Sequence, residues 1–165
     1  MANNYLEQLI AEWYEYRGYY IRRNVKVGKL ERGGYSGELD LVGFNPSKNH
    51  LIHVEPSVDA ESWAKREARY LRKFEAGRKY IPTLFEGFNL PEDIEQIALF
   101  ATGSTLNYKT VGGVRVVLMV DLFHEILADL KHKSILKESI PESQPLLRTL
   151  QIVAHYRKNL YSALY

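Results

Sequence analysis

Hydrophobic and polar positions recur with two different periods along the chain. Residues 3–17 carry apolar side chains three and four positions apart, which predicts a helix closed by Gly18. Residues 19–27, 38–44 and 51–56 are rich in β-forming residues, and turn residues separate them. The pattern predicts a helix followed by three strands, the first two joined as a hairpin with a long basic tip.

After these strands the period lengthens to about three and a half. Residues 60–79 predict a helix that ends near Gly77, since a glycine often follows the last helical turn. The rest predicts a loop, two buried strands and two helices, at residues 81–96, 97–102, 114–120, 121–133 and 146–164. This element order predicts an α/β fold in which helices cover both faces of a mixed sheet.

Composition limits the kind of protein. A chain of 165 residues with 45% hydrophobic residues can build one core, so we expect a single domain over residues 1–165. No apolar run approaches the roughly 18 residues of a membrane span, and acids stand where a secretion signal would carry bases. The absence of cysteine excludes disulfides and cysteine-ligated zinc. We expect a cytoplasmic protein with no membrane partner.

Two acids interrupt the apolar strands. Because side chains alternate along a strand, Glu38, Asp40 and Val42 are expected on one face, with Leu39 and Leu41 on the other. The short turn at residues 45–50 makes the next strand a neighbour, so Asp40 and Glu55 can share a face. Two carboxylates held together in a core repel each other and need a cation. Mg²⁺ is the natural occupant, since it prefers oxygen ligands.

The element order, Asp40, and the Glu55-Pro56-Ser57 tripeptide together resemble the PD-(D/E)-x-K phosphodiesterase superfamily, which includes restriction endonucleases, Holliday-junction resolvases and Mrr-like enzymes. The likeness covers residues 3 to about 120 and leaves 121–165 as a helical extension. It implies a restriction-endonuclease-like αβββαβ core and a Mg²⁺- or Mn²⁺-dependent endonuclease that hydrolyses DNA. Asp40, Glu55 and the Pro56 carbonyl would hold the metal, and Glu7 would position a water or a second ion.

The chain departs from this family at one motif position. Ser57 stands where the family has lysine, and a hydroxyl supplies no charge to stabilise hydroxide or phosphate. Either a base from another element substitutes or the centre is inert. A basic stripe at intervals of three and four on the following helix supplies candidates, of which we prefer Lys65; the hairpin lysines are further options.

The charge distribution indicates a nucleic-acid partner. The formal charge is only +2, but residues 61–80 hold seven Lys or Arg against three Glu, and the hairpin is also basic. We expect DNA contacts from both segments, at Arg22, Arg23, Lys26, Lys29, Arg69 and Lys73.

Three alternatives remain open from the sequence. A degenerate relative would bind nucleic acid or a protein partner without cleaving it. A small-molecule metallohydrolase would require His53 to join Asp40 and Glu55 at a metal. The last predicted helix either completes the core or binds a second subunit, which would make the protein a homodimer.

Overall fold

The computed structural model describes residues 4–58, 61–103 and 108–164. The helices and strands of these residues are α1 (Tyr5–Tyr16), β1 (Tyr20–Lys29), β2 (Tyr35–Asn45), β3 (His50–Ser57), α2 (Trp63–Leu84), β4 (Ile94–Phe100), β5 (Thr110–Val111), β6 (Val114–Leu118), α3 (Met119–Leu130), α4 (Pro145–His155) and α5 (Arg157–Leu164). The strands form one open sheet in the order β1-β2-β3-β4-β6-β5. β3, β4 and β6 are parallel and the other neighbours antiparallel, which confirms the predicted mixed α/β class.

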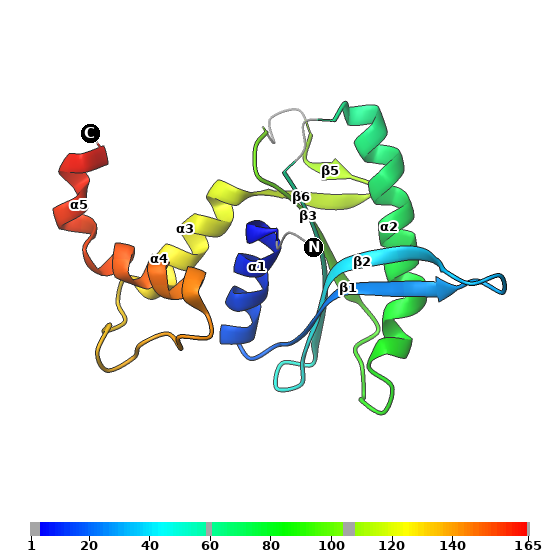
Figure 1. Cartoon of the computed structure of the whole chain (residues 1–165), viewed down its shortest axis with the longest axis horizontal. Helices are drawn as coiled ribbons and strands as arrows, with labels where there is room; N and C mark the ends of the chain where they lie inside the picture. The colour runs from blue at the N-terminus through cyan, green and yellow to red at the C-terminus, as the bar shows by residue number, and fades with distance from the viewer. Residues whose placement is uncertain (1–3, 59–60, 104–107, 165) are drawn as a thin grey trace.

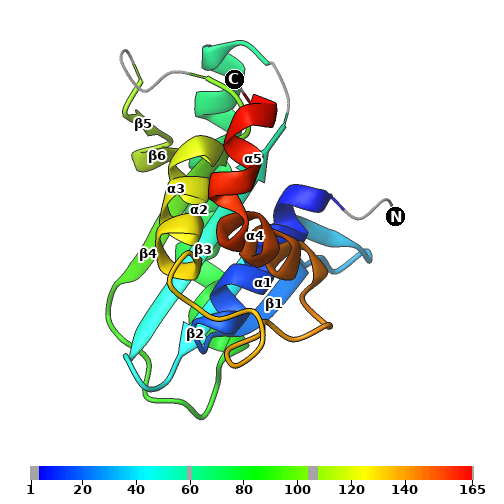
Figure 2. The same cartoon turned by 90° about the vertical axis from the view of Figure 1, so that its left-hand side faces the viewer.

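Helices cover both faces of the sheet, as predicted (Figure 1). On one face, α1, α3 and α4 pack against apolar side chains of the central strands, among them Leu41, Ile52 and Val54. Figure 2 shows these three helices in front of the strands. On the other face lies α2, which buries Phe74 and Ile81 against the sheet. Because β3 is covered on both sides, its polar side chains are removed from water.

Helix α2 is longer than the sequence pattern predicted, because Gly77 lies inside it and does not end it. The helix continues to Leu84 and includes Pro82, so the predicted loop is wrong over residues 81–84. A Cβ atom at position 77 would lie 2.6 Å from Cε1 of His53 and 2.9 Å from Nε2 of Gln96. Glycine is therefore needed for the close approach of α2 to the sheet.

Gly77→Ala is expected to destabilise the protein, although alanine is the better helix former. Intrinsic propensity alone would favour alanine by about 1 kcal/mol. The overlap with His53 reverses the sign, and overpacking of this kind costs about 1–3 kcal/mol. Urea denaturation measures the difference. Gly37→Ala is the matched control, because its added Cβ would meet only Val27 at an ordinary 3.7 Å. Equal or higher stability of Gly77→Ala would contradict the packing described.

The alternation of side chains between the two faces of the sheet is interrupted in β2 at Asp40. Leu41 packs in the cluster beneath α1, whereas Leu39 packs with Val25 in the cluster beneath α2, so the two leucines do not share a face as predicted. Asp40 lies opposite Asn24, between the paired residues of β1 and β2, and Asn24 has a left-handed backbone with φ of 51°. This conformation is uncommon for a residue other than glycine, and it turns the hairpin at this point.

The last predicted helix consists of two helices that meet at Tyr156. Leu146 and Leu150 of α4 pack against the core, but α5 buries no side chain and Leu160 and Leu164 are exposed. The apolar stripe therefore completes the core only in its first half. Within the part of the chain that the structure describes, no helix has both the length and the apolar character to cross a bilayer.

Candidate active site

Asp40 and Glu55 lie side by side on adjacent strands. β2 and β3 pair antiparallel up to Leu41 and Val54, and the two acids occupy the next position of that register. The backbone N–H of Asp40 donates to Oε1 of Glu55 at 3.2 Å. Glu55 is 1% exposed, so its carboxylate lies in the core of the fold. The expected meeting of the two carboxylates is thus present.

The cation between the carboxylates comes from Lys73 and not from Lys65. Nζ of Lys73 donates to Oδ1 of Asp40 at 2.8 Å and also to Oε2 of Glu55. Lys65 lies eight residues earlier on α2, about 12 Å along the helix axis, and is exposed. The basic stripe thus supplies the cation, as predicted, but through Lys73 and not through the preferred Lys65. Lys73 was one of the candidates of that stripe and was also expected as a DNA contact.

Burial and the charges of neighbouring side chains determine the protonation states of Asp40 and Lys73. Burial, and then the charge of Glu55, raise the pKa of Asp40 to about 7, while Lys73 opposes the increase. Burial lowers the pKa of Lys73, but Glu55 and Asp40 outweigh it, so the net pKa lies above the ordinary value. At neutral pH the ammonium is charged and Asp40 is partly protonated. Asp40 and Glu55 together can therefore attract a further positive charge in addition to the ammonium of Lys73.

A buried histidine fixes the orientation of Glu55. His53 is fully buried, and burial lowers its pKa to about 3, so the ring is neutral. Its Nε2 lies 2.7 Å from Oε1 of Glu55, and its Nδ1 lies 3.0 Å from the amide nitrogen of Gln96. An amide nitrogen only donates, so Nδ1 accepts and Nε2–H donates to Glu55. Oε1 is thereby engaged, and Oε2 turns towards Lys73.

The orientation of the Gln96 amide follows from its other partners. Its nitrogen also donates to the carbonyl of Phe74 at 2.9 Å, and its oxygen accepts from Arg78 at 2.7 Å. Both ring nitrogens of His53 are thus engaged within the protein, and neither is available to a metal. Gln96 was missed from the sequence, since it belonged to a predicted loop. Its place on β4, beside His53 on β3, depends on strand pairing.

An open pocket of about 270 Å³ lies beside the two acids. It is lined by Asn4, Asp40, Pro56, Ser57, Val58, Arg69, Tyr70 and Lys73. Nη2 of Arg69 lies 3.4 Å from the Ser57 hydroxyl, and Nη1 pairs with Glu61 at 2.7 Å. The pocket thus brings a second cation to the position where the motif lysine was expected.

Glu7 lies near this group on α1. Burial and then the charge of Asp40 raise the pKa of Glu7, which shows that the two carboxylates interact. Asn4, which caps α1, donates to Oε1 of Glu7 at 3.0 Å. Its predicted contact with a water or second ion stays a prediction.

The expected DNA contacts on β1 are exposed. Arg23, Lys26 and Lys29 face solvent, and Arg22 donates to the carbonyl of Leu84 at 3.0 Å. Asn24 lies opposite Asp40, so Lys26 and Lys29 lie between that acid and the tip of the hairpin, whereas Arg22 and Arg23 lie on the side of the sheet centre. Arg23 lines a separate pocket with Gln8 and Glu12 of α1.

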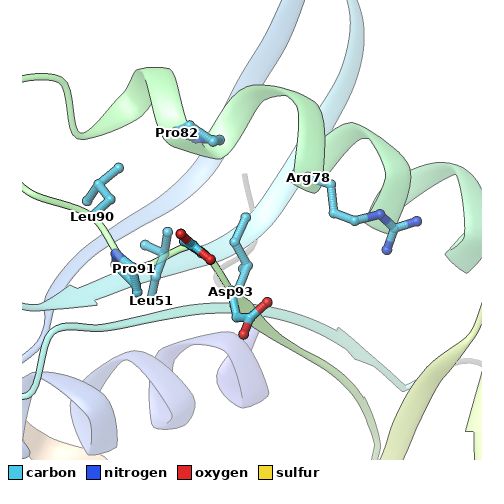
Figure 3. Close-up of a pocket in the computed structure, with 8 residues that line it drawn as sticks. Leu51, Arg78, Pro82, Leu90, Pro91 and Asp93 are labelled. Atoms are coloured by element: carbon cyan, nitrogen blue, oxygen red, sulfur yellow. The ribbon is translucent and has the colours of Figure 1, made fainter.

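A second cavity, of about 310 Å³, lies at the opposite end of β3 (Figure 3). Leu51, Pro82, Leu90 and Pro91 give it mostly apolar walls, and Arg78 and Asp93 lie at its edge. Among its described lining residues there is no pair of carboxylates facing a lysine. The pocket at Asp40 is the better candidate for chemistry.

A metal at the site would depend on a small set of oxygen ligands. Across the described residues, no group of three or more His, Asp or Glu side chains could hold a metal ion together. Asp40 and Glu55 supply two carboxylates, and Pro56, whose carbonyl is the third predicted ligand, lines the same pocket as Asp40. The ammonium of Lys73, which contacts both acids, marks a position that attracts positive charge. Two acids and a carbonyl fit a hard ion that keeps several waters, such as Mg²⁺.

In comparisons with known proteins, the chain matches no protein-family model and no curated protein sequence.

Proposed function

We propose that this protein is a metal-dependent endonuclease with a restriction-endonuclease-like core, acting on phosphodiester bonds in DNA. The observation that carries the proposal is the contact of one lysine, Lys73, with two acids on adjacent strands, Asp40 and Glu55, beside an open pocket. This combination of two carboxylates and a cation is the one that the resemblance to the PD-(D/E)-x-K superfamily implies. The basic hairpin next to it supplies a surface for a polyanion.

Asp40, Glu55 and the carbonyl of Pro56 would hold Mg²⁺ or Mn²⁺. When bound, such an ion supplies a more acidic water and stabilises negative charge on a phosphate. His53 engages Oε1 of Glu55, which directs Oε2 towards Lys73. An ion held by Glu55 would therefore share Oε2 with the ammonium of Lys73 or displace it.

Lys73 and Arg69 together would supply the positive charge that the family's motif lysine supplies. The ammonium of Lys73 stabilises the ionised form of Asp40. The guanidinium of Arg69, beside Ser57, can donate to two phosphate oxygens at once. The hydroxyl of Ser57 can orient a water by hydrogen bonding. Positive charge is therefore retained around the reacting phosphate although position 57 is neutral.

Cleavage of a closed circular plasmid tests the proposal. With Mg²⁺ or Mn²⁺, the wild-type protein should convert supercoiled DNA into nicked or linear forms, which requires an endonuclease. EDTA should stop the reaction. Retained DNA binding without cleavage in either metal would instead support the degenerate alternative, which the serine at position 57 favours. Engagement of both ring nitrogens of His53 argues against the metallohydrolase alternative.

Metal binding should depend on pH through Asp40. Because the pKa of this acid is raised to about 7, a proton competes with the ion below that pH. The apparent affinity for Mn²⁺ should rise about tenfold per pH unit towards pH 7 and level off above it. Calorimetric titration between pH 5.5 and 8.5 measures this profile. Affinity that is unchanged between pH 5.5 and 7 would show that Asp40 is no ligand.

A further inference from the structure

The hairpin formed by β1 and β2 leaves the sheet as a two-stranded ribbon. β1 pairs with β2 from Tyr20 to Lys29, whereas β2 pairs with β3 only from Leu41 to Asn45. The part of the hairpin beyond Asp40 therefore has no third strand. Figure 1 shows it crossing α2 and projecting past that helix.

Helix α2 supports one side of the ribbon up to Gly28. Val25 and Val27 pack with Ile81 of α2 and with Phe85, which follows the helix, and a Cβ atom at Gly28 would lie 2.7 Å from the hydroxyl of Tyr80. From Lys29 to Ser36 every residue is exposed. The ribbon is thus held from behind and ends in a tip, residues 29–35, that extends into solvent.

The tip has a defined conformation. The N–H of Leu30 donates to the carbonyl of Gly34 at 3.1 Å, and the N–H of Gly33 donates to the carbonyl of Leu30 at 3.0 Å. Gly33 and Gly34 have φ angles of 87° and 83°, which glycine adopts without strain. A tip ordered by its own hydrogen bonds loses little entropy on binding, which favours its use as a contact element.

Positive charge exceeds negative charge on the hairpin. From residue 20 to residue 40 its cations are Arg22, Arg23, Lys26, Lys29 and Arg32, and its acids are Glu31, Glu38 and Asp40. Lys29 and Arg32 belong to the tip, and Lys26 lies between the tip and Asp40. A strip of this kind complements the phosphates on either side of a DNA groove.

We propose that the tip of this hairpin enters the major groove of duplex DNA, so that the substrate of the site is double-stranded DNA. The inference rests on the proposed function and names its substrate class. The major groove is about 12 Å wide and about 8.5 Å deep and admits a two-stranded β-ribbon, whereas the minor groove is only about 6 Å wide. The three or four residues beyond Gly28 extend about 10–13 Å, which is enough to reach the groove floor. The major groove of A-form RNA is too narrow for such a ribbon.

Binding to an uncleaved substrate tests this proposal. Asp40→Asn without added metal serves as the background, and fluorescence anisotropy compares a duplex DNA, one of its strands and an RNA duplex of the same sequence. We expect the DNA duplex to bind at least tenfold more tightly than the other two. Equal affinity for the single strand or for the RNA duplex would overturn the inference.

Two variants of the hairpin test which of its residues contact the DNA. In the first, residues 30–34 are replaced by Asn-Gly, which can join the paired Lys29 and Tyr35 as a two-residue turn. This variant should lose the preference for duplex DNA while its thermal unfolding stays unchanged. In the second, Lys26→Gln with Lys29→Gln should lower the slope of log affinity against log salt by about 2.

Lys131→Gln with Lys137→Gln is the matched control for lost charge, since both residues are exposed and lie between α3 and α4, far along the chain from the hairpin. Duplex preference that survives the tip replacement would overturn the inference even if plasmid is cut. Tip-dependent duplex binding without plasmid cleavage would uphold it, and the nuclease proposal alone would fail.

Discussion

Asp40→Asn is expected to abolish plasmid cleavage and, at the same time, to stabilise the fold above pH 7. The variant keeps the size of the side chain but removes a negative charge that burial and Glu55 make unfavourable. If Asp40 holds the metal as proposed, its replacement should lower the cleavage rate by about 100-fold or more. Stability should increase by about 1–3 kcal/mol, because a repulsion in the core is removed.

The stability gained by Asp40→Asn should change with pH in a direction that can be measured. Asp40 has a raised pKa in the folded protein, so between about pH 4 and about pH 7 the folded state holds a proton that the unfolded chain has released. Stability of the wild type therefore falls as pH rises through this window, and the cost is complete above pH 7. The gain from Asp40→Asn should be large at pH 8 and small at pH 4, where the acid is neutral in the folded protein and about half ionised in the unfolded chain.

Urea denaturation at pH 4 and pH 8 measures both values. Asp93→Asn is the control, because Asp93 is exposed and distant from the two acids. A variant that is less stable than the wild type at pH 8 would show that the ion pair with Lys73 outweighs the repulsion, contrary to the electrostatics described here.

Lys73→Met should inactivate the protein and destabilise it, and Lys65→Met should do neither. Removing the ammonium leaves Glu55 buried without its cation, and such a loss costs about 3 kcal/mol. Protonation of Asp40 then becomes easier, so its pKa should rise further. Lys65 is an exposed residue of the same helix, and its replacement should change stability by less than about 0.5 kcal/mol.

Adding Mg²⁺ to Lys73→Met tests whether the lost stability is due to the missing positive charge or to altered packing. If Asp40 and Glu55 hold the ion, Mg²⁺ at millimolar concentration should restore part of the stability lost by Lys73→Met and change Lys65→Met little. Thermal unfolding with and without Mg²⁺ gives the comparison, and plasmid cleavage gives the activity. Inactivation by Lys65→Met together with full activity of Lys73→Met would return the catalytic role to the residue that sequence pattern alone favoured.

Periodicity was sufficient to predict most of the fold. The order of helices and long strands follows from where apolar residues recur, and the pairing of β2 with β3 follows from the short turn between them. The acids Asp40 and Glu55 could therefore be brought together from the sequence. β5, with only Thr110 and Val111, is too short to produce a period of its own.

The remaining features depend on contacts between layers. Gly77 is a typical helix end by sequence, and only its contact with His53 explains why it lies inside α2. The choice between Lys65 and Lys73 depends on where α2 crosses the strands, which helical spacing leaves open. Gln96 and Asn24 act through residues of neighbouring strands, so their own sequence neighbourhoods carry no signal of their roles.

The acids of the site belong to the sheet and its cation belongs to the helix above it, and this separation affects how the protein can evolve. Hydrogen-bonded strands hold the acids, while the packing of α2 and the contacts of Lys73 with both acids hold the ammonium over them. Mutations that vary the basic residues of α2 can thus tune the electrostatic field of the site without altering its acidic ligands. Ser57, at the end of β3, is buried and accepts from Arg69, so a change at this position would also displace a cation of the site.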